Sequence, residues 1–304
     1  MVILSLKRAT TLGFVVLTVA VLGAAAACSG SSTSRGRLKV VATTIQVGAL
    51  TREVAGPDAD VKTLIGPGID PHDFEAGASD LRAIGDATIV FRNGLGLDDW
   101  LDRIISSGGG KAKTVTVTDG IQLRTIGGHP DPHVWQDPVN DKVMVQNIAT
   151  ALAKADPAHA ADYNANARKY EAKLDSVDTQ VREIIDTIPP ANRKMVTDHD
   201  AFGYFIQRYG LTYIGAVIPS TSTQAESSAK DIAALEDLIR REHVKAIFSE
   251  ETANPKVSNQ IARDTGAKVV DTLYGDSLGK PGSGADTVDG MILDNARTIA
   301  EALK

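Results

Sequence analysis

Short apolar runs alternate with helix-like segments along most of the chain. In the first half the runs predict strands over residues 38–42, 61–65, 88–91 and 114–117, and helices over 47–54, 79–84 and 97–105. The second half repeats the scheme, with strands over 194–197, 211–217, 246–249 and 268–271, and helices over 201–209, 227–242, 256–265 and 288–303. Strands that alternate with helices favour parallel sheets covered by helices. We therefore expect an α/β protein of two lobes, each a parallel sheet flanked by helices.

One long amphipathic helix is predicted between the two halves. It begins at Asp156-Pro157, a typical N-cap followed by proline at the first helical position, and ends before Pro189-Pro190. Its apolar positions recur at steps of three and four: Tyr163, Ala167, Tyr170, Leu174, Val177, Val181, Ile184 and Ile188. At 1.5 Å per residue, such a helix is about 48 Å long. We expect residues 157–188 to be a rigid connector between an N-terminal lobe, 38–156, and a C-terminal lobe, 189–304.

The N-terminus has the pattern of a secretory signal peptide. Lys7 and Arg8 precede an apolar run over residues 12–22, and small residues lead to Cys28. The apolar run is short for a membrane span, which needs roughly 20 residues. We expect residues 1–27 to be removed, Cys28 to be acylated, and residues 28–37, rich in serine and glycine, to form a flexible tether. The protein would then be exported and lipid-anchored to the outer face of the cell membrane, with membrane lipid as a partner.

The composition of the chain argues against some classes of binding partner and covalent link. The chain of 304 residues carries a formal net charge of −6 and has no basic cluster, so nucleic acid is an unsuitable partner. Cys28 is the only cysteine, so no internal disulfide can form. The length after cleavage is sufficient for two lobes, and we expect a monomer.

Segment 131–138, Asp-Pro-His-Val-Trp-Gln-Asp-Pro, holds His133 between two Asp-Pro pairs. Proline restricts itself and the preceding residue, so the loop fixes the position of the imidazole. His72, His199 and Asp276 also lie beyond the ends of predicted strands. Ligands of open α/β sheets bind at the carboxyl ends of the strands. We therefore expect these four side chains to meet between the lobes as a metal site.

Other residues offer alternatives. Glu250 and Glu251 follow a predicted strand and are rival carboxylate ligands. Considered by itself, Asp276 also fits the role of a turn residue after a glycine. His129 lies in a glycine-rich stretch and is at most an accessory contact, whereas His159 and His243 fit solvated surface positions. Metal-bound imidazoles usually donate their second N–H to a carboxylate. The candidates for this role are Asp73, Asp131, Asp198 and Asp200.

The donor set favours zinc. Three imidazoles and one carboxylate fill a four-ligand shell, and imidazole suits zinc, while manganese prefers more oxygen ligands. Manganese remains the alternative metal. Because metal binding requires neutral imidazoles, the affinity is expected to fall below about pH 6.5.

The chain resembles the metal-binding lipoproteins that deliver zinc or manganese to bacterial ABC importers, the TroA/ZnuA-like solute-binding proteins. The resemblance covers essentially all of the chain after residue 27. The motifs that carry it are Asp-Pro-His-Asp-Phe-Glu at 70–75, Asn-Gly-Leu-Gly-Leu at 93–97 with Trp-Leu at 100–101, segment 131–138, His-Asp-Ala-Phe-Gly-Tyr-Phe at 199–205 with Tyr-Gly-Leu at 209–211, and Phe-Ser-Glu at 248–250.

The resemblance implies two α/β lobes joined by one long helix, a metal held by His72, His133, His199 and Asp276, an ABC permease as membrane partner, and no catalysis. Many zinc-binding members carry a long loop rich in His and Asp before the second ligand. Only His129-Pro130-Asp131 stands at that place here, which implies no large metal-gathering loop.

Two other classes of protein compete with metal capture. A zinc hydrolase needs an open metal position and a base beside a bound water, but the chain has no His-Glu-x-x-His motif and four protein ligands leave little room. A surface adhesin with a structural metal is the second alternative. It would not make growth depend on metal import.

Overall fold

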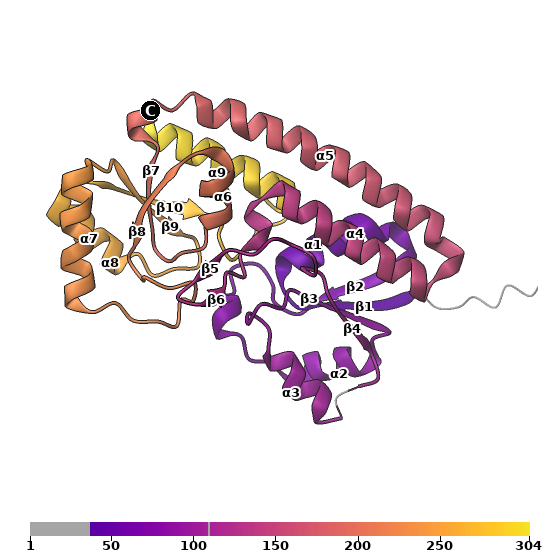
Figure 1. The fold of residues 1–304 in the computed structure, drawn as a ribbon. Coiled ribbons are helices and arrows are strands. Elements are labelled where there is room, and N and C mark those ends of the chain that lie inside the picture. The colour runs from indigo at the N-terminus through magenta and orange to yellow at the C-terminus, as the bar shows by residue number, and fades with distance from the viewer. Residues whose placement is uncertain (1–36, 109) are drawn as a thin grey trace, which may run out of the picture. The chain divides into compact units, whose positions relative to one another are not determined.

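Two four-stranded parallel sheets form the framework of the residues that the structure describes, 37–108 and 110–304 (Figure 1). The first has the order β2-β1-β3-β4 and consists of β1 (Leu38–Ala42), β2 (Ala59–Thr63), β3 (Ile89–Arg92) and β4 (Lys113–Thr116). The second has the order β10-β9-β7-β8 and consists of β7 (Lys194–Thr197), β8 (Thr212–Ala216), β9 (Ala246–Glu250) and β10 (Lys268–Leu273). Both sheets thus use their strands in the same order, which confirms the predicted repetition.

This structure is a computed structural model of the chain. The predicted signal peptide, Cys28 and nearly all of the predicted tether lie outside the described residues. None of the described helices has the length and apolar character that a membrane span needs.

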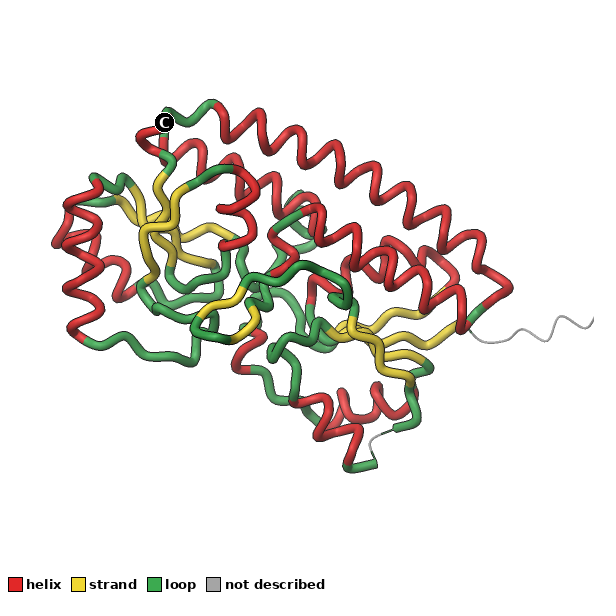
Figure 2. Tube along the Cα trace, viewed as in Figure 1, coloured by secondary structure: helices red, strands yellow, loops and turns green. Residues whose placement is uncertain are grey.

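Each sheet is covered on both faces, because successive strand residues point to opposite sides. In the first sheet Val40 and Phe91 pack toward α1 (Ile45–Ala55), whereas Val41 and Val90 pack toward α2 (Ala78–Asp86) and α3 (Trp100–Ser106). In the second sheet Phe248 faces α6 (Gly203–Tyr209) and α9 (Val288–Leu303), while α7 (Ala229–Glu242) and α8 (Lys256–Thr265) cover the other face. Figure 2 shows the helices around each group of strands. The predicted α/β fold class is confirmed.

The predicted connector is observed as a 3-10 turn, Pro157–His159, followed by α5 (Ala160–Asp186). α5 packs on α1 in the first lobe and on α6 and α9 in the second. Its buried stripe follows the predicted positions except at the end, where Ile185 is buried and Ile184 is only partly so. The side chain of Asp156 does not cap the helix; it accepts a hydrogen bond from the Tyr163 hydroxyl (3.1 Å).

The sequence analysis missed two elements between β4 and α5. One is helix α4 (Pro138–Ala155), which packs along α5 and begins where Asp137 accepts a hydrogen bond from the Val139 amide (2.8 Å). The other is a short antiparallel hairpin of β5 (Thr125–Ile126) and β6 (His129–Pro130). The hairpin precedes the predicted ligand loop and α4 follows it, so His133 lies between two ordered elements.

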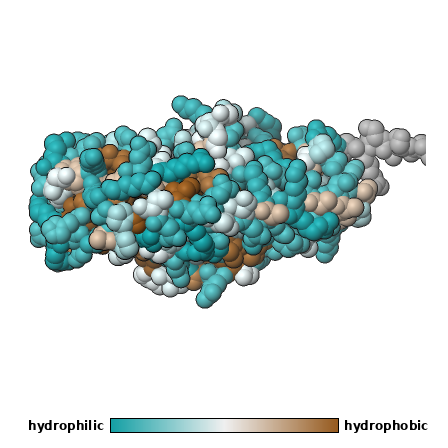
Figure 3. Space-filling view, turned by 90° about the horizontal axis from the view of Figure 1, so that it is seen from above, coloured by the Kyte–Doolittle hydropathy of each residue, from teal (hydrophilic) through white to brown (hydrophobic). Residues whose placement is uncertain are grey.

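A single cluster of buried apolar side chains extends through both lobes. It joins residues of β1 and α1 to residues of α4, α5, α6 and α9, and residues 37–304 form one compact unit. Seen from above, from the side on which α5 lies in Figure 1, the surface is mainly hydrophilic with separate hydrophobic patches (Figure 3). The exposed face of α5 is therefore polar, and its apolar face holds the lobes together.

Candidate metal centre

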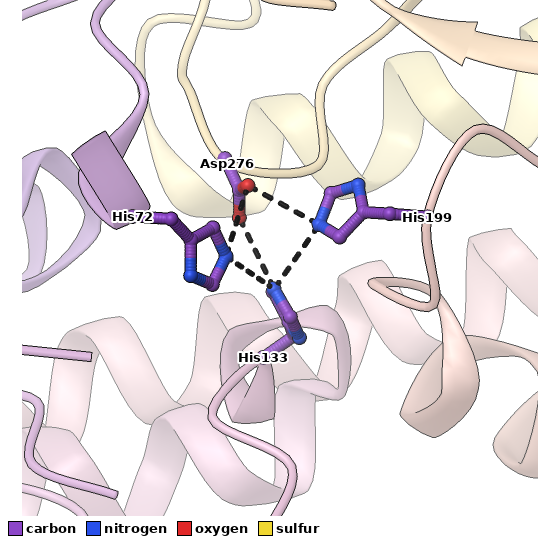
Figure 4. A group of neighbouring side chains, drawn as sticks. All are labelled: His72, His133, His199 and Asp276. Atoms are coloured by element: carbon purple, nitrogen blue, oxygen red, sulfur yellow. Dashed lines mark hydrogen bonds and ion pairs between the residues drawn. The ribbon is translucent and has the colours of Figure 1, made fainter. Parts of the chain in front are cut away.

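Four side chains from distant parts of the chain point toward one another between the two sheets (Figure 4). His72 lies in a 3-10 turn, Pro71–Asp73, after β2, and His133 directly precedes another, Val134–Gln136. His199 follows β7 and Asp276 follows β10. The structure thus brings together the four residues that the sequence analysis selected, two from each lobe.

The distances from the donor atoms of His133 and Asp276 to the other donor atoms are close to the edge of a tetrahedral zinc shell. Nε2 of His133 lies 3.4 Å from Nε2 of His72 and 3.4 Å from Nε2 of His199. Oδ1 of Asp276 lies 3.3 Å from Nε2 of His133, and Oδ2 lies 3.4 Å and 3.3 Å from those of His72 and His199. Four donors at the usual zinc bond lengths of about 2.0–2.1 Å stand about 3.3 Å apart at the corners of a tetrahedron. A single divalent cation fits at the centre of this group.

The imidazole of His133 is held in place through its Nδ1 atom. Oδ1 of Asp131 lies 2.8 Å from Nδ1 of His133 and accepts a hydrogen bond from its backbone amide (3.0 Å). Oδ2 of Asp131 pairs with Arg124. Because Nδ1 faces a carboxylate, Nε2 presents its lone pair to the metal position. This is the role that the sequence analysis considered for Asp131.

The segment around His133 is also anchored through its backbone. The Asn93 side chain donates to the Pro132 carbonyl (3.1 Å), and the Tyr204 hydroxyl donates to the Asp131 carbonyl (3.1 Å). The Arg124 guanidinium lies against Gly203, where any Cβ would collide with it. The second lobe therefore braces a ligand loop of the first, and Asp200 lies 3.6 Å from the same guanidinium.

His199 is held by two carboxylates. Its backbone amide donates to Oδ1 of Asp198 (2.7 Å), and its Nδ1 lies 3.1 Å from Oε1 of Glu250 and 3.3 Å from Oδ1 of Asp198. Oδ2 of Asp198 in turn accepts a hydrogen bond from the Glu250 amide (2.8 Å). Glu250 therefore supports His199 from outside the group of four, whereas Glu251 is exposed. The supporting role of Glu250 was not predicted, although its position at the end of a strand drew attention to it.

Asp276 is positioned through its backbone. Its amide donates to Oε2 of Glu250 (2.8 Å), and the preceding Gly275 carbonyl accepts from the indole of Trp135 (2.8 Å) and the amide of Gln136 (3.2 Å). Any Cβ at position 275 would collide with the Glu250 carboxylate, so only glycine permits this packing. Both carboxylate oxygens of Asp276 are buried and face the Nε2 atoms of the three histidines at 3.3–3.4 Å. A buried carboxylate requires a cationic partner, which a metal ion or a protonated imidazole can supply.

Burial and opposite charge shift the pKa values in this group. Burial disfavours the imidazolium, but the carboxylates of Asp276 and Asp131 outweigh it and raise the pKa of His133 to about 9. Burial also opposes the charged form of His199, yet Glu250 and Asp276 raise its pKa well above the usual value. The three imidazoles hold the pKa of Asp276 well below its usual value despite burial. Burial, Asp198 and Asp276 raise the pKa of Glu250 to about 7. These shifts favour protonated His133 and His199 beside an ionised Asp276.

The remaining candidates lie elsewhere. His129 is exposed on β6 and lines a cavity that also includes His72, but it does not join the ligand group. His159 pairs with Asp156 at 2.6 Å, and His243 ends α7 in the left-handed conformation. Asp73 is exposed. His243 is exposed, as expected for a solvated histidine, whereas His159 is partly buried and paired with its aspartate.

A family model described as "Zinc-uptake complex component A periplasmic" (ZnuA) matches residues 40–302. The chain belongs to the ZnuA family. As a member of this family, it is a metal-binding component of an ABC importer.

Relatives of the ZnuA-family chain carry different metals in their names. The manganese-binding lipoprotein MntA of Bacillus subtilis is 31% identical over 297 residues, which are 94% of this chain and 96% of MntA. The iron-binding protein YfeA of Yersinia pestis is 29% identical over 301 residues, 97% of this chain and 96% of YfeA. The periplasmic zinc-binding protein TroA of Treponema pallidum has a similar structure, with a TM-score of 0.83, 30% identity, and coverage of 88% of this chain and 99% of TroA. The fold is shared, and the names span three metals.

Proposed function

We propose that this protein captures a zinc ion outside the cytoplasm and delivers it to the membrane permease of an ABC importer. The observation that carries the proposal is the group of three imidazoles and one carboxylate at tetrahedral spacing, from His72, His133, His199 and Asp276. Imidazole nitrogen suits zinc, and zinc in proteins is commonly four-coordinate. The zinc-binding relative TroA supports the same choice.

Manganese is the second candidate, and one observation favours it. Both oxygens of Asp276 face the group, Oδ1 toward His133 and Oδ2 toward His72 and His199, so the carboxylate can bind a metal through both and raise the number of oxygen ligands. The name of MntA points the same way. Against manganese, three of the four ligand side chains supply nitrogen.

Capture without catalysis follows from the same group. Four protein ligands complete a tetrahedral shell, whereas a catalytic zinc keeps a position open for water. We therefore propose a transport role and not a hydrolase, and we prefer transport to a surface adhesin because the matching family model describes a component of a metal-uptake complex. We also propose residues 1–27 as a signal peptide, Cys28 as the acylated anchor at the outer face of the membrane, 157–188 as the link between lobes, and a monomeric state.

Competitive titration tests the proposal. Protein stripped with a chelator is mixed with zinc and manganese together, passed through a desalting column and subjected to elemental analysis. One zinc ion per chain, retained against an excess of manganese, is the expected result. Preferential retention of manganese would replace zinc by the second candidate, and retention of neither metal would refute metal capture.

A further inference from the structure

The loop that carries His72, residues 66–74, belongs to the first lobe but is hydrogen-bonded to the second. The Thr223 hydroxyl, in the connection between β8 and α7, donates to Oδ2 of Asp70 (2.6 Å). The Gly68 amide donates to Oγ of Ser277 (2.8 Å), next to Asp276. Gly68 has a φ of 71°, in the left-handed region that glycine adopts without strain. These two bonds connect the loop to the lobe opposite its own.

The same loop is weakly tied to its own lobe. Within residues 37–108 and 110–304, the hydrogen bonds of loop 66–74 other than these two are internal to it, apart from the contact of His72 with His133. Phe74, at its end, packs against Trp100. Ile69 is 45% exposed, and His72 is the least buried of the four candidate ligands. The loop is thus anchored at its ends and fixed in the middle by the second lobe.

Space on both sides allows this loop to move. A cavity of about 460 Å³ is lined by Asp70, Thr223 and His199, and another of about 480 Å³ is lined by His72 and Ser222. Asp70 borders the first cavity and His72 borders the second, so free space adjoins both ends of this segment. Displacement of this segment would open the metal position to solvent without breaking the apolar core.

We propose that Thr223 and Ser277 form a latch that holds His72 over the captured ion and sets the rate at which the ion leaves. This inference rests on the proposed metal capture. Thr223 and Ser277 are positioning residues: they contact the loop and act on the metal through His72. With the latch formed, Nε2 of His72 completes the ligand group; with the latch open, the ion keeps His133, His199 and Asp276 and is exposed on one side.

The test measures zinc dissociation from the full chain in a stopped-flow instrument, with a chromogenic chelator in large excess. Thr223→Val keeps the size of the side chain and removes the hydroxyl, and should accelerate dissociation about tenfold, because a hydrogen bond to a carboxylate is lost. Ser277→Ala should accelerate it about fivefold. The double variant should exceed either one. Zinc stoichiometry and the thermal stability of the metal-free protein should remain those of the original chain.

Two further variants separate the latch from a general structural effect. Thr223→Ser retains the hydroxyl and should restore slow dissociation. Thr252→Val is the matched control: Thr252 lines the same cavity in the same lobe without a hydrogen bond to loop 66–74, so the rate should not change.

The outcomes distinguish the two proposals. If the original chain binds zinc and Thr223→Val and Ser277→Ala release it at the original rate, the latch is refuted while metal capture stands. Equal acceleration by Thr223→Ser and Thr223→Val would also refute it, since the hydroxyl would then be irrelevant. If the original chain retains no zinc, the proposed function fails, and the latch with it.

Discussion

The same tripeptide, Asp-Pro-His, occurs at 70–72 and at 131–133, and the structure uses it in two ways. In both copies an aspartate oxygen accepts a hydrogen bond from the backbone amide of its own histidine, at 2.8 Å for His72 and 3.0 Å for His133. The copies differ in what else the aspartate contacts. Asp131 also faces the imidazole of His133, whereas Asp70 turns its second oxygen to Thr223 of the other lobe.

The comparison shows that the backbone turn and the imidazole ring are held in place by different interactions. Proline and the aspartate–amide bond determine the local backbone in both copies. The ring of His133 is fixed by a carboxylate that is itself held by Arg124, while His72 depends on contacts made by its loop. His133 is fully buried and His72 keeps some exposure. For the proposed metal site, one copy would supply a rigid ligand and the other a ligand that can leave.

Replacing each of the two histidines by alanine, one at a time, tests this comparison and should give the largest effect. At a metal concentration a thousandfold above the dissociation constant, bound zinc should add roughly 4 kcal/mol to the free energy of unfolding. His133→Ala should abolish this gain, because a fully buried ligand whose ring Asp131 holds in place is lost. His72→Ala should leave part of it, since the other three ligands remain buried and in place. Thermal unfolding with and without zinc measures both, and equal losses would remove the distinction.

The raised pKa of His133, about 9, predicts a strong pH dependence. The proton on the folded, metal-free form stabilises it fully below pH 6.5, and this contribution is lost as the pH rises through about 9. Zinc must displace this proton and that of His199, whose pKa is also raised, so its affinity should fall at least roughly tenfold per pH unit below 9. The sequence alone placed this loss below about pH 6.5.

Zinc titration and thermal unfolding of the metal-free protein between pH 6 and 9 measure the two trends together. His243→Asn, at an αL position away from the site, should leave both unchanged. A flat affinity between pH 7 and 9 would show that His133 is neutral without metal.

Substitution of the two aspartates sharpens the comparison. Asp131→Asn removes the charge that faces the His133 ring and should weaken zinc binding about 10- to 100-fold, the usual cost of losing a carboxylate behind a metal-bound imidazole. Asp70→Asn retains an oxygen for the His72 amide and should change the affinity less. Competition with a calibrated chelator measures both constants. A larger loss for Asp70→Asn would reverse the roles assigned to the two copies.

The smallest expected effect comes from the brace on the first lobe. Tyr204→Phe removes the hydroxyl that donates to the Asp131 carbonyl and accepts from the Arg124 amide. The loss of such hydrogen bonds should lower the free energy of unfolding by about 1 kcal/mol and the zinc affinity a few-fold. Chemical denaturation with and without zinc measures the two changes. An unaltered affinity would show that the brace supports only the fold.

The sequence was sufficient for features that local patterns determine. Short apolar runs located the eight strands of the two sheets, apolar positions at steps of three and four located the buried stripe of α5, and strand ends located the four candidate ligands. α4 was missed although Asp137-Pro138 is a helix start, because polar residues such as Asn140 and Asp141 are buried and blur its apolar face. Ile185 replaced Ile184 because a straight helix drifts from a regular three-and-four spacing.

Contacts between residues far apart in the chain could not be predicted from the sequence. The bonds from Thr223 to Asp70 and from Trp135 to Gly275 join residues separated by 153 and 140 positions. Their formation depends on how the lobes pack, which no local pattern encodes. For the same reason the sequence named Asp131 and Asp198 only as candidates for supporting the imidazoles and overlooked Arg124.

The apolar core that runs through both lobes has a consequence for how cargo preference can change. The loop residues that face the metal position contribute little to that core, so replacing them leaves the scaffold intact. The metal preference can then vary through the residues at the site while the apolar core maintains the fold. Proteins named for zinc, manganese and iron that share this chain's overall sequence or architecture are the expected result of such a division.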